Sequence, residues 1–192
     1  MKSENRTISE RYWVFKVVIT GEPGVGKTSL AERFVSGHFL NDYRASIGVN
    51  MYVKKLELGN MDIPVEKDKD HHVDIQLWDI AGHERWKKTR HLYYGGAQGA
   101  LIIGDLTREK TFEEIETFWF PDLMEHCNDE IPLILVGNKA DLPRKVNQEK
   151  LDSLGEEINA LETIITSAKT GNNVETAFRL MSKKVIERSE KI

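Results

Sequence analysis

Cysteine is almost absent from this chain, since Cys127 is the single one among 192 residues. One cysteine cannot form an internal disulfide, so a disulfide-stapled secreted domain is excluded, and Cys127 is expected to be a small packing residue in a reducing compartment. The sequence also lacks a secretory signal segment and any run of about 18 apolar residues, which a membrane-spanning helix needs. We therefore expect a cytoplasmic protein.

An excess of positive charge is missing too. Lysine and arginine number 27 against 31 aspartate and glutamate, which gives a net charge of −4 with both signs interspersed. Such a surface does not attract a phosphate backbone, so nucleic acid is not expected as a partner. No shift in composition divides the chain, and we expect one domain over residues 12–192 after a mobile, polar N-terminus over residues 1–11. Residues 183–192 contain no cysteine, so the chain as given carries no prenyl membrane anchor.

The most informative segment is residues 21–28, Gly-Glu-Pro-Gly-Val-Gly-Lys-Thr, which matches the phosphate-loop pattern G-x-x-x-x-G-K-[ST]. An apolar run precedes it and a helix-like segment follows it, as that pattern requires. The glycines allow successive N–H groups to point into an anion-binding nest, and the helix adds its partial positive charge. Lys27 can reach the terminal phosphates, and the Thr28 hydroxyl can ligate magnesium. The predicted phosphate-binding residues are Gly24, Val25, Gly26, Lys27, Thr28 and Ser29.

A second motif, Asn138-Lys139-Ala140-Asp141, indicates which base is bound. Guanine carries a ring N–H beside an exocyclic amine, and the Asp141 carboxylate can accept from both, whereas adenine would leave that carboxylate unpaired. Asn138 would tie this loop to the phosphate loop, and the stem of Lys139 could cover the base. Taken alone, the motif is also compatible with a solvated loop. Its place about 110 residues after the phosphate loop favours guanine, as does a later segment suited to a backbone contact with the guanine carbonyl: Ser167, Ala168 and Lys169.

A third group of residues suits a metal ion and a γ-phosphate. Asp79 follows the strand-like segment at residues 73–78, where its carboxylate can hold magnesium through water. Gly82 leaves an N–H free for close approach of a γ-phosphate, which a side chain would hinder. Ser46, in a loop before another strand, is the candidate for a second hydroxyl ligand. The predicted magnesium site is Thr28, Ser46 and Asp79.

These motifs together resemble those of Ras-superfamily small GTPases, most of all the Rab branch. The resemblance implies a molecular switch that binds GTP or GDP with Mg²⁺, hydrolyses GTP slowly and is linked to membrane trafficking. It places Ser46 in the first switch loop and residues 79–94 in the second. It adds Tyr43 and Phe39 to the nucleotide contacts, with Phe39 against the guanine, although without the family Phe39 would read as a core aromatic. The matching segments run in the family's order along nearly the whole chain: residues 21–28, 46–49, 78–85, 93–97, 138–141 and 167–169.

Partners are likewise implied by the resemblance. Effectors, an exchange factor and an activating protein would contact residues 41–51 and 79–94, and would place the protein at the periphery of membranes. Met51, Trp78 and Tyr93 stand where Rab proteins place an aromatic triad read by effectors. For these three residues an ordinary half-buried core is the alternative interpretation.

The chain departs from the family pattern at several positions. His83 stands where the family usually has the glutamine that orients the attacking water, so the expected catalytic group is His83, Lys27 and Gly82. Pro23 occupies a small-residue position, and its ring is expected to crowd the entry of an activating arginine. Ser46 replaces a threonine and Met51 a phenylalanine. A stalled, GTP-bound binding module therefore remains an alternative function. A different P-loop enzyme, such as a nucleotide kinase or an ATPase, is opposed by residues 138–141.

Alternating apolar runs and helical patterns predict an α/β fold of the P-loop NTPase type. A mostly parallel six-stranded sheet with helices on both faces is expected, and a helix-free link makes its first edge an antiparallel hairpin. The insert at residues 59–72 contains Asp68, Asp70, His71 and His72, a conceivable metal site, although a solvated loop or a partner surface is the plainer interpretation. Predicted strands are residues 12–20, 49–58, 73–78, 99–104, 131–137 and 163–166, and predicted helices are 27–36, 86–94, 111–126, 147–160 and 173–188.

Overall fold

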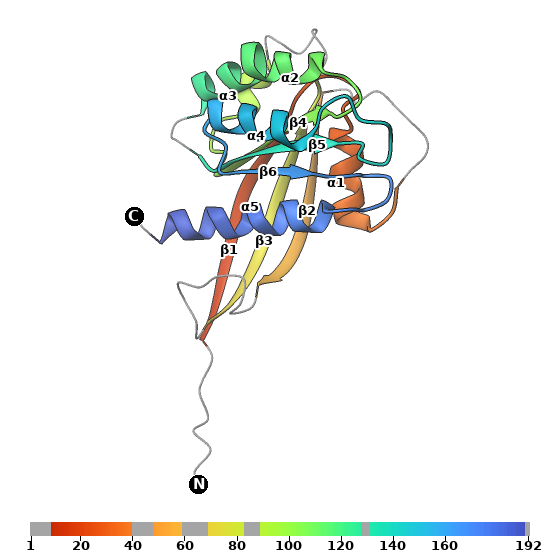
Figure 1. Ribbon diagram of the computed structural model, residues 1–192. Coiled ribbons are helices and arrows are strands. Elements are labelled where there is room, and N and C mark those ends of the chain that lie inside the picture. The colour runs from red at the N-terminus through yellow and green to blue at the C-terminus, as the bar shows by residue number, and fades with distance from the viewer. Residues whose placement is uncertain (1–8, 40–47, 59–68, 83–88, 128–130, 191–192) are drawn as a thin grey trace.

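A six-stranded sheet with helices on both faces forms the centre of the molecule (Figure 1). The computed structural model describes residues 9–39, 48–58, 69–82, 89–127 and 131–190. The strands are β1 (Ser9–Thr20), β2 (Val49–Leu58), β3 (Lys69–Ile80), β4 (Gly99–Asp105), β5 (Leu133–Asn138) and β6 (Glu162–Ile165). The helices are α1 (Lys27–Ser36), α2 (Lys110–Glu114), α3 (Phe120–His126), α4 (Gln148–Glu157) and α5 (Val174–Ser189), with a 3₁₀ turn η2 (Arg90–Tyr93) and a π-helical segment η3 (Ile115–Trp119).

Strand order across the sheet is β2-β3-β1-β4-β5-β6. Strands β2 and β3 pair antiparallel, from Val49 opposite Ile80 to Leu58 opposite His71, and every other neighbouring pair is parallel. Parallel neighbours require crossover connections, and these carry the helices to the two faces. The predicted α/β fold of a P-loop NTPase, with one antiparallel edge hairpin, is confirmed.

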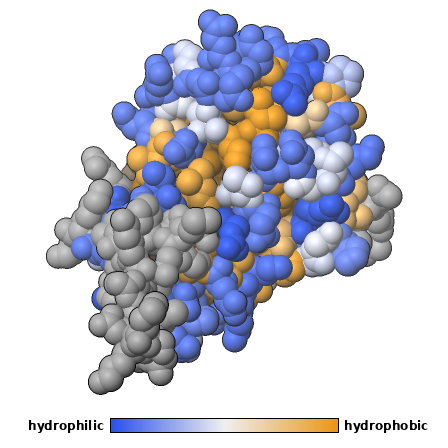
Figure 2. Space-filling model, turned by 60° about the horizontal axis from the view of Figure 1, so that its bottom comes forward, coloured by the Kyte–Doolittle hydropathy of each residue, from blue (hydrophilic) through white to orange (hydrophobic). Residues whose placement is uncertain are grey.

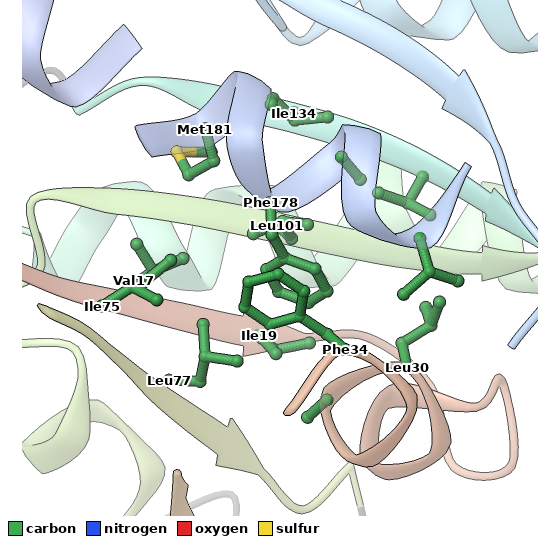
Figure 3. Close-up of a cluster of buried hydrophobic side chains, with 14 of the residues drawn as sticks. Val17, Ile19, Leu30, Phe34, Ile75, Leu77, Leu101, Ile134, Phe178 and Met181 are labelled. Atoms are coloured by element: carbon green, nitrogen blue, oxygen red, sulfur yellow. The ribbon is translucent and has the colours of Figure 1, made fainter. Parts of the chain in front are cut away.

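The hydrophobic core consists of two clusters, one on each face of the sheet. Helices α1 and α5 cover the first, where the rings of Phe34 and Phe178 stack with centroids 4.1 Å apart (Figure 3). Segment η3 and helices α3 and α4 cover the second. Because β4 and β5 are buried at every position, they appear in the sequence as unbroken apolar runs. Within the described ranges, no helix is long and apolar enough to cross a bilayer.

Strands β1 and β3 extend beyond their predicted bounds. Strand β1 begins at Ser9, so residues 9–11, expected in the mobile N-terminus, belong to the sheet instead. They pair in parallel with β3 from Lys69 onward. Strand β3 accordingly includes His71 and His72, which the sequence analysis places in the hairpin insert. Each strand supports the other, and local composition does not encode this tertiary pairing.

The conceivable metal site in the insert finds no support. His71 is buried, and its Nδ1 accepts a hydrogen bond of 2.8 Å from Trp13 Nε1, while His72 stacks on Tyr12. Asp68 lies outside the described residues. In the part of the chain that the structure describes, no three His, Cys, Asp or Glu side chains are grouped so that they could hold a metal.

The helix predicted at residues 111–126 is interrupted. Helix α2 passes into the π-helical segment η3 and then into α3, which carries Pro121 in its first turn. A π-helical turn holds one more residue than an α-helical turn, and such turns are frequent at functional sites. The helix predicted at residues 86–94 is shorter than expected where it is described, because only the 3₁₀ turn η2 is formed; residues 83–88 lie outside the described ranges.

The stack of Phe34 on Phe178 generates a stability prediction. Replacing Phe178 with alanine removes a fully buried ring between α5 and the sheet, and should lower the free energy of unfolding by about 3–5 kcal/mol. Urea denaturation measures this change. Leu161, which is 51% exposed, is the control, because Leu161→Ala should cost less than about 1 kcal/mol. Equal losses in both variants would contradict the assignment of Phe178 to the core.

Candidate functional site

The phosphate loop connects the end of β1 to the start of α1. Gly21, Gly24 and Gly26 have φ values of 135°, 74° and 100°, a region that side-chain-bearing residues rarely adopt. Gly26 caps α1, and the first hydrogen bond into the helix runs from Leu30 N to Gly26 O. The first N–H groups of a helix have no partner within it. They therefore form the anion-binding end that the motif predicts.

Lys27 lies across this loop. Its side chain is buried, and Nζ donates to the carbonyl oxygens of Gly21 and Glu22 at 2.7 and 2.9 Å. Burial lowers the pKa of Lys27 from 10.5 to about 8; Asp79 and Glu22 oppose this shift, while nearby arginines add to it. Two carbonyl oxygens and the nearby charges of Asp79 and Glu22 compensate this buried ammonium only in part, since its pKa is still lowered. An added anionic oxygen would favour its charged form.

Two of the three residues predicted to bind magnesium, Thr28 and Asp79, lie in contact. Thr28 Oγ1 donates to Asp79 Oδ2 at 2.5 Å, and Asn50 Nδ2 lies 3.4 Å from the same oxygen. Asp79 is fully buried, and its Oδ1 has no hydrogen-bond partner among the described residues. Burial raises the pKa of Asp79, and the bonds from Thr28 and Asn50 and the charge of Lys27 oppose the rise. An unsatisfied buried carboxylate oxygen beside a hydroxyl fits a hard divalent cation such as Mg²⁺.

Gly82 brings the second switch region against the phosphate loop. A Cβ atom at this position would stand 2.5 Å from Gly21 O and 2.8 Å from Pro23 N, closer than real side chains approach. The backbone can lie here only because residue 82 is glycine. Gly82 therefore lies beside the phosphate loop. Its contact with a γ-phosphate stays a prediction, and His83 lies outside the described residues.

Asn138 joins the base-recognition loop to its neighbours. Its side chain is fully buried, and Nδ2 donates to Val25 O at 2.9 Å. Its Oδ1 accepts from Thr166 Oγ1 and from Ala168 N, each at 3.2 Å. One carboxamide thus connects the phosphate loop, the end of β5 and the segment after β6. The predicted tie between the loops is present.

Asp141 and Ser167 meet at the open side of this loop. Ser167 Oγ donates to Asp141 Oδ1 at 2.6 Å, which orients the carboxylate. Asp141 is exposed in the turn after β5. Ala168 is buried beside Ser167, and Lys169 is exposed.

The ammonium group of Lys139 is held in an ion pair beside the base-recognition loop. Its backbone adopts a left-handed conformation with φ 69°, and its Nζ forms an ion pair of 2.7 Å with Asp105 Oδ2. Phe39 is half-buried and packs against the first core cluster, as its reading as a core aromatic predicts. Tyr43 and Ser46 lie outside the described residues.

Arg90, which the sequence analysis does not predict as a site residue, is a buried cation at the end of the second switch region. The guanidinium of Arg90 lies 4.4 Å from the ring centroids of both Phe118 and Trp119. Arg90 Nε pairs with Asp122 at 2.9 Å, and Trp119 Nε1 donates to Glu22 of the phosphate loop at 3.2 Å. No motif predicts this cluster, because it depends on the π-helical segment η3.

Two of the three residues expected to be read by effectors, Met51 and Trp78, lie on the edge hairpin, and the third, Tyr93, lies in η2. Met51 is 60% exposed and pairs in register with Trp78, whose ring centroid lies 6.3 Å from that of Tyr93. Lys16 Nζ stands 4.1 Å over the Trp78 ring. An exposed apolar side chain beside half-buried aromatic rings is compatible with an interaction surface.

Figure 2 shows the surface of one face of the molecule, on which hydrophobic residues lie across the middle and hydrophilic residues surround them. Exposed apolar areas that are large and contiguous often mark sites of interaction.

Comparison with known proteins agrees with this geometry. Residues 16–187 match the Ras family. "Ras-related protein Rab-25" of Canis lupus familiaris is 39% identical over 189 residues, a match that covers 97% of this chain and 83% of the relative. "Ras-related protein RABA1i" of Arabidopsis thaliana is 38% identical over 185 residues, with 91% and 79% covered. Ras-family GTPases bind GTP or GDP with Mg²⁺ and hydrolyse GTP. The chain therefore belongs to the Ras family, within which it is a Rab-like GTP-binding switch and GTPase.

Proposed function

We propose how the residues of this chain divide the work of the GTPase. The N–H groups of residues 24–29 and the Lys27 ammonium bind the phosphates. Thr28 and Ser46 ligate magnesium, and Asp79 holds it through water. The base lies between the stem of Lys139 and Phe39, with Asp141 and the Ser167-Ala168-Lys169 segment on its edge, and Tyr43 completes the contacts. The observation that supports this division most strongly is the Asn138 carboxamide, because it holds the phosphate loop and the base loop in one site.

The first test is to identify the nucleotide that copurifies with the protein. Denaturation followed by chromatography separates GDP, GTP and adenine nucleotides. GDP would support turnover, and GTP would support the stalled binding module. Equal competition by GDP and ADP for the unmodified protein would contradict the assignment of residues 138–141 to the base.

Partners are proposed to act through residues 41–51 and 79–94, the two switch regions. Loops that contact a γ-phosphate become ordered with GTP and relax after hydrolysis, so a partner can read the nucleotide state there. Effectors are proposed to bind the exposed Met51 together with the half-buried Trp78 and Tyr93, while an exchange factor and an activating protein contact the neighbouring loops. In this proposal the protein is cytoplasmic, acts in membrane trafficking and reaches membranes through these partners.

Base choice is expected to follow Asp141. In Asp141→Asn one carboxylate oxygen becomes an amide donor, which suits the carbonyl of xanthine and not the amine of guanine. GDP affinity should fall by about 10²-fold or more while affinity for xanthosine diphosphate rises. Competition against a fluorescent GDP analogue measures both. Ser167→Ala is the matched control, because it removes the 2.6 Å hydrogen bond that orients Asp141. It should lower the affinity for GDP without raising the affinity for xanthosine diphosphate.

Nucleotide affinity should depend on pH through Lys27. Burial lowers the pKa of Lys27 to about 8 in the nucleotide-free protein, and bound phosphates would hold the amine charged. Affinity for GDP should therefore be constant below about pH 7.5 and fall toward about tenfold per pH unit above pH 8, because binding then requires uptake of a proton. Isothermal titration from pH 7 to 9 tests this. A guanidinium stays protonated in that range, so the GDP affinity of Lys27→Arg should not change between pH 7 and 9. A GDP affinity that is independent of pH in the unmodified protein would contradict the role of Lys27.

Hydrolysis is expected to use His83. A neutral imidazole can accept from a water and donate to a phosphate oxygen, but on opposite sides of a stiff ring, so it positions the water less readily than glutamine does. We expect slow hydrolysis that speeds up when a partner orders residues 83–90. His83→Ala should slow single-turnover hydrolysis by up to about 10²-fold and leave GTP affinity nearly unchanged. An unchanged rate would make His83 a bystander.

A further inference from the structure

Asp105, the last residue of β4, is a buried carboxylate that none of the nucleotide motifs includes. Its side chain is fully buried, and it stands opposite Asn138 in the pairing of β4 with β5. The carboxyl ends of β1, β4 and β5 lie along one edge of the sheet. Asp105 is therefore placed between the phosphate loop, which follows β1, and the base loop, which follows β5.

Four donors converge on this carboxylate. Lys139 Nζ and Arg108 Nε lie 2.7 and 2.8 Å from Oδ2. The backbone N–H and the hydroxyl of Thr107 donate to Oδ1 at 3.0 and 2.7 Å. Burial by itself would raise the pKa of Asp105, but the bonds from Lys139, Thr107 and Arg108 outweigh it and lower the pKa. The carboxylate is thus ionised, and it forms ion pairs with Lys139 and Arg108 that hold both side chains in place.

Each of the two cations reaches a different loop. Lys139 belongs to the base motif, and its left-handed backbone, with φ 69°, is one that lysine rarely adopts. The second arm of the Arg108 guanidinium donates from Nη2 to the carbonyl oxygen of Pro23 in the phosphate loop at 3.1 Å. A planar guanidinium can bond a carboxylate and a carbonyl at the same time because its donors form a fixed fork. The bridge from Pro23 through Arg108 and Asp105 to Lys139 is continuous.

We propose that Arg108 and Asp105 are positioning residues of the nucleotide site, which link the phosphate loop at Pro23 to the base-covering Lys139. This inference rests on the proposed function, since it takes both loops to contact the nucleotide. Loss of the bridge leaves each loop to hold its part of the nucleotide separately. The expected consequence is faster escape of GDP, with base preference unchanged because Asp141 is untouched.

The test measures the dissociation rate of a fluorescent GDP analogue, chased with excess GDP, from four proteins: unmodified, Arg108→Ala, Lys139→Ala and the double variant. Arg108→Ala should raise the rate roughly fivefold or more. The two substitutions break the same bridge, so the double variant should dissociate more slowly than the product of the two single effects requires. An unchanged rate in Arg108→Ala, or effects that multiply independently, would overturn the proposal.

Two further variants separate positioning from general stability. Arg108→Lys keeps a cation beside Asp105 but loses the fork in which Nε and Nη2 bond two separate acceptors, so it should release GDP faster than the unmodified protein; full rescue by lysine would overturn the bridge. Arg179→Ala removes a comparable arginine that bonds the Glu57 carbonyl at 2.9 Å on the other side of the fold, and it should leave GDP dissociation unchanged. If it accelerated release equally, the effect would be one of global stability. Failure of the proposed function would appear separately, as loss of guanine preference in the unmodified protein.

Discussion

The buried carboxamide of Asn138 is the interaction on which the site depends. It donates to the phosphate loop at Val25 and accepts from Ala168 after β6, so loops far apart in the sequence share one side chain. A parallel sheet makes this possible, because the strands before these loops end at the same edge. Gly26 is required for the approach, since a Cβ there would collide with the Asn138 amide. The glycines and the asparagine therefore form a single packing unit.

At the phosphate end of this site, two charged side chains of opposite sign are buried. Burial lowers the pKa of Lys27 and raises the pKa of Asp79, and the attraction between the two charges opposes both shifts only in part. In the proposed function, a magnesium ion and a chain of phosphates supply the charges that the two groups lack. Nucleotide binding would then stabilise the fold, because the buried charges are better compensated in the complex.

Features fixed by local spacing could be predicted from the sequence, and features made by tertiary packing could not. The phosphate loop, the bounds of α1 and β2, and the tie from Asn138 to the phosphate loop follow from short motifs with set geometry. The early start of β1 depends on its pairing with β3. The ion pairs of Asp105 could not be predicted from the sequence. Like Asp79, Asp105 comes at the end of a strand, but only the fold shows that Arg108 and Lys139 lie beside its carboxylate.

The π-helical segment η3 has a consequence for how this chain tolerates insertions and deletions. Successive residues of an α-helix are rotated by about 100° around its axis, so one residue more or fewer turns every side chain that follows onto another face. The wider turn at Ile115–Trp119 absorbs one such residue, and in doing so aims Trp119 at Glu22 while Asp122 meets Arg90. Loss of one residue within this turn would convert it to an ordinary α-helical turn and leave Asp122 of α3 facing Arg90. The same loss within α3 itself would rotate every later residue of that helix onto another face.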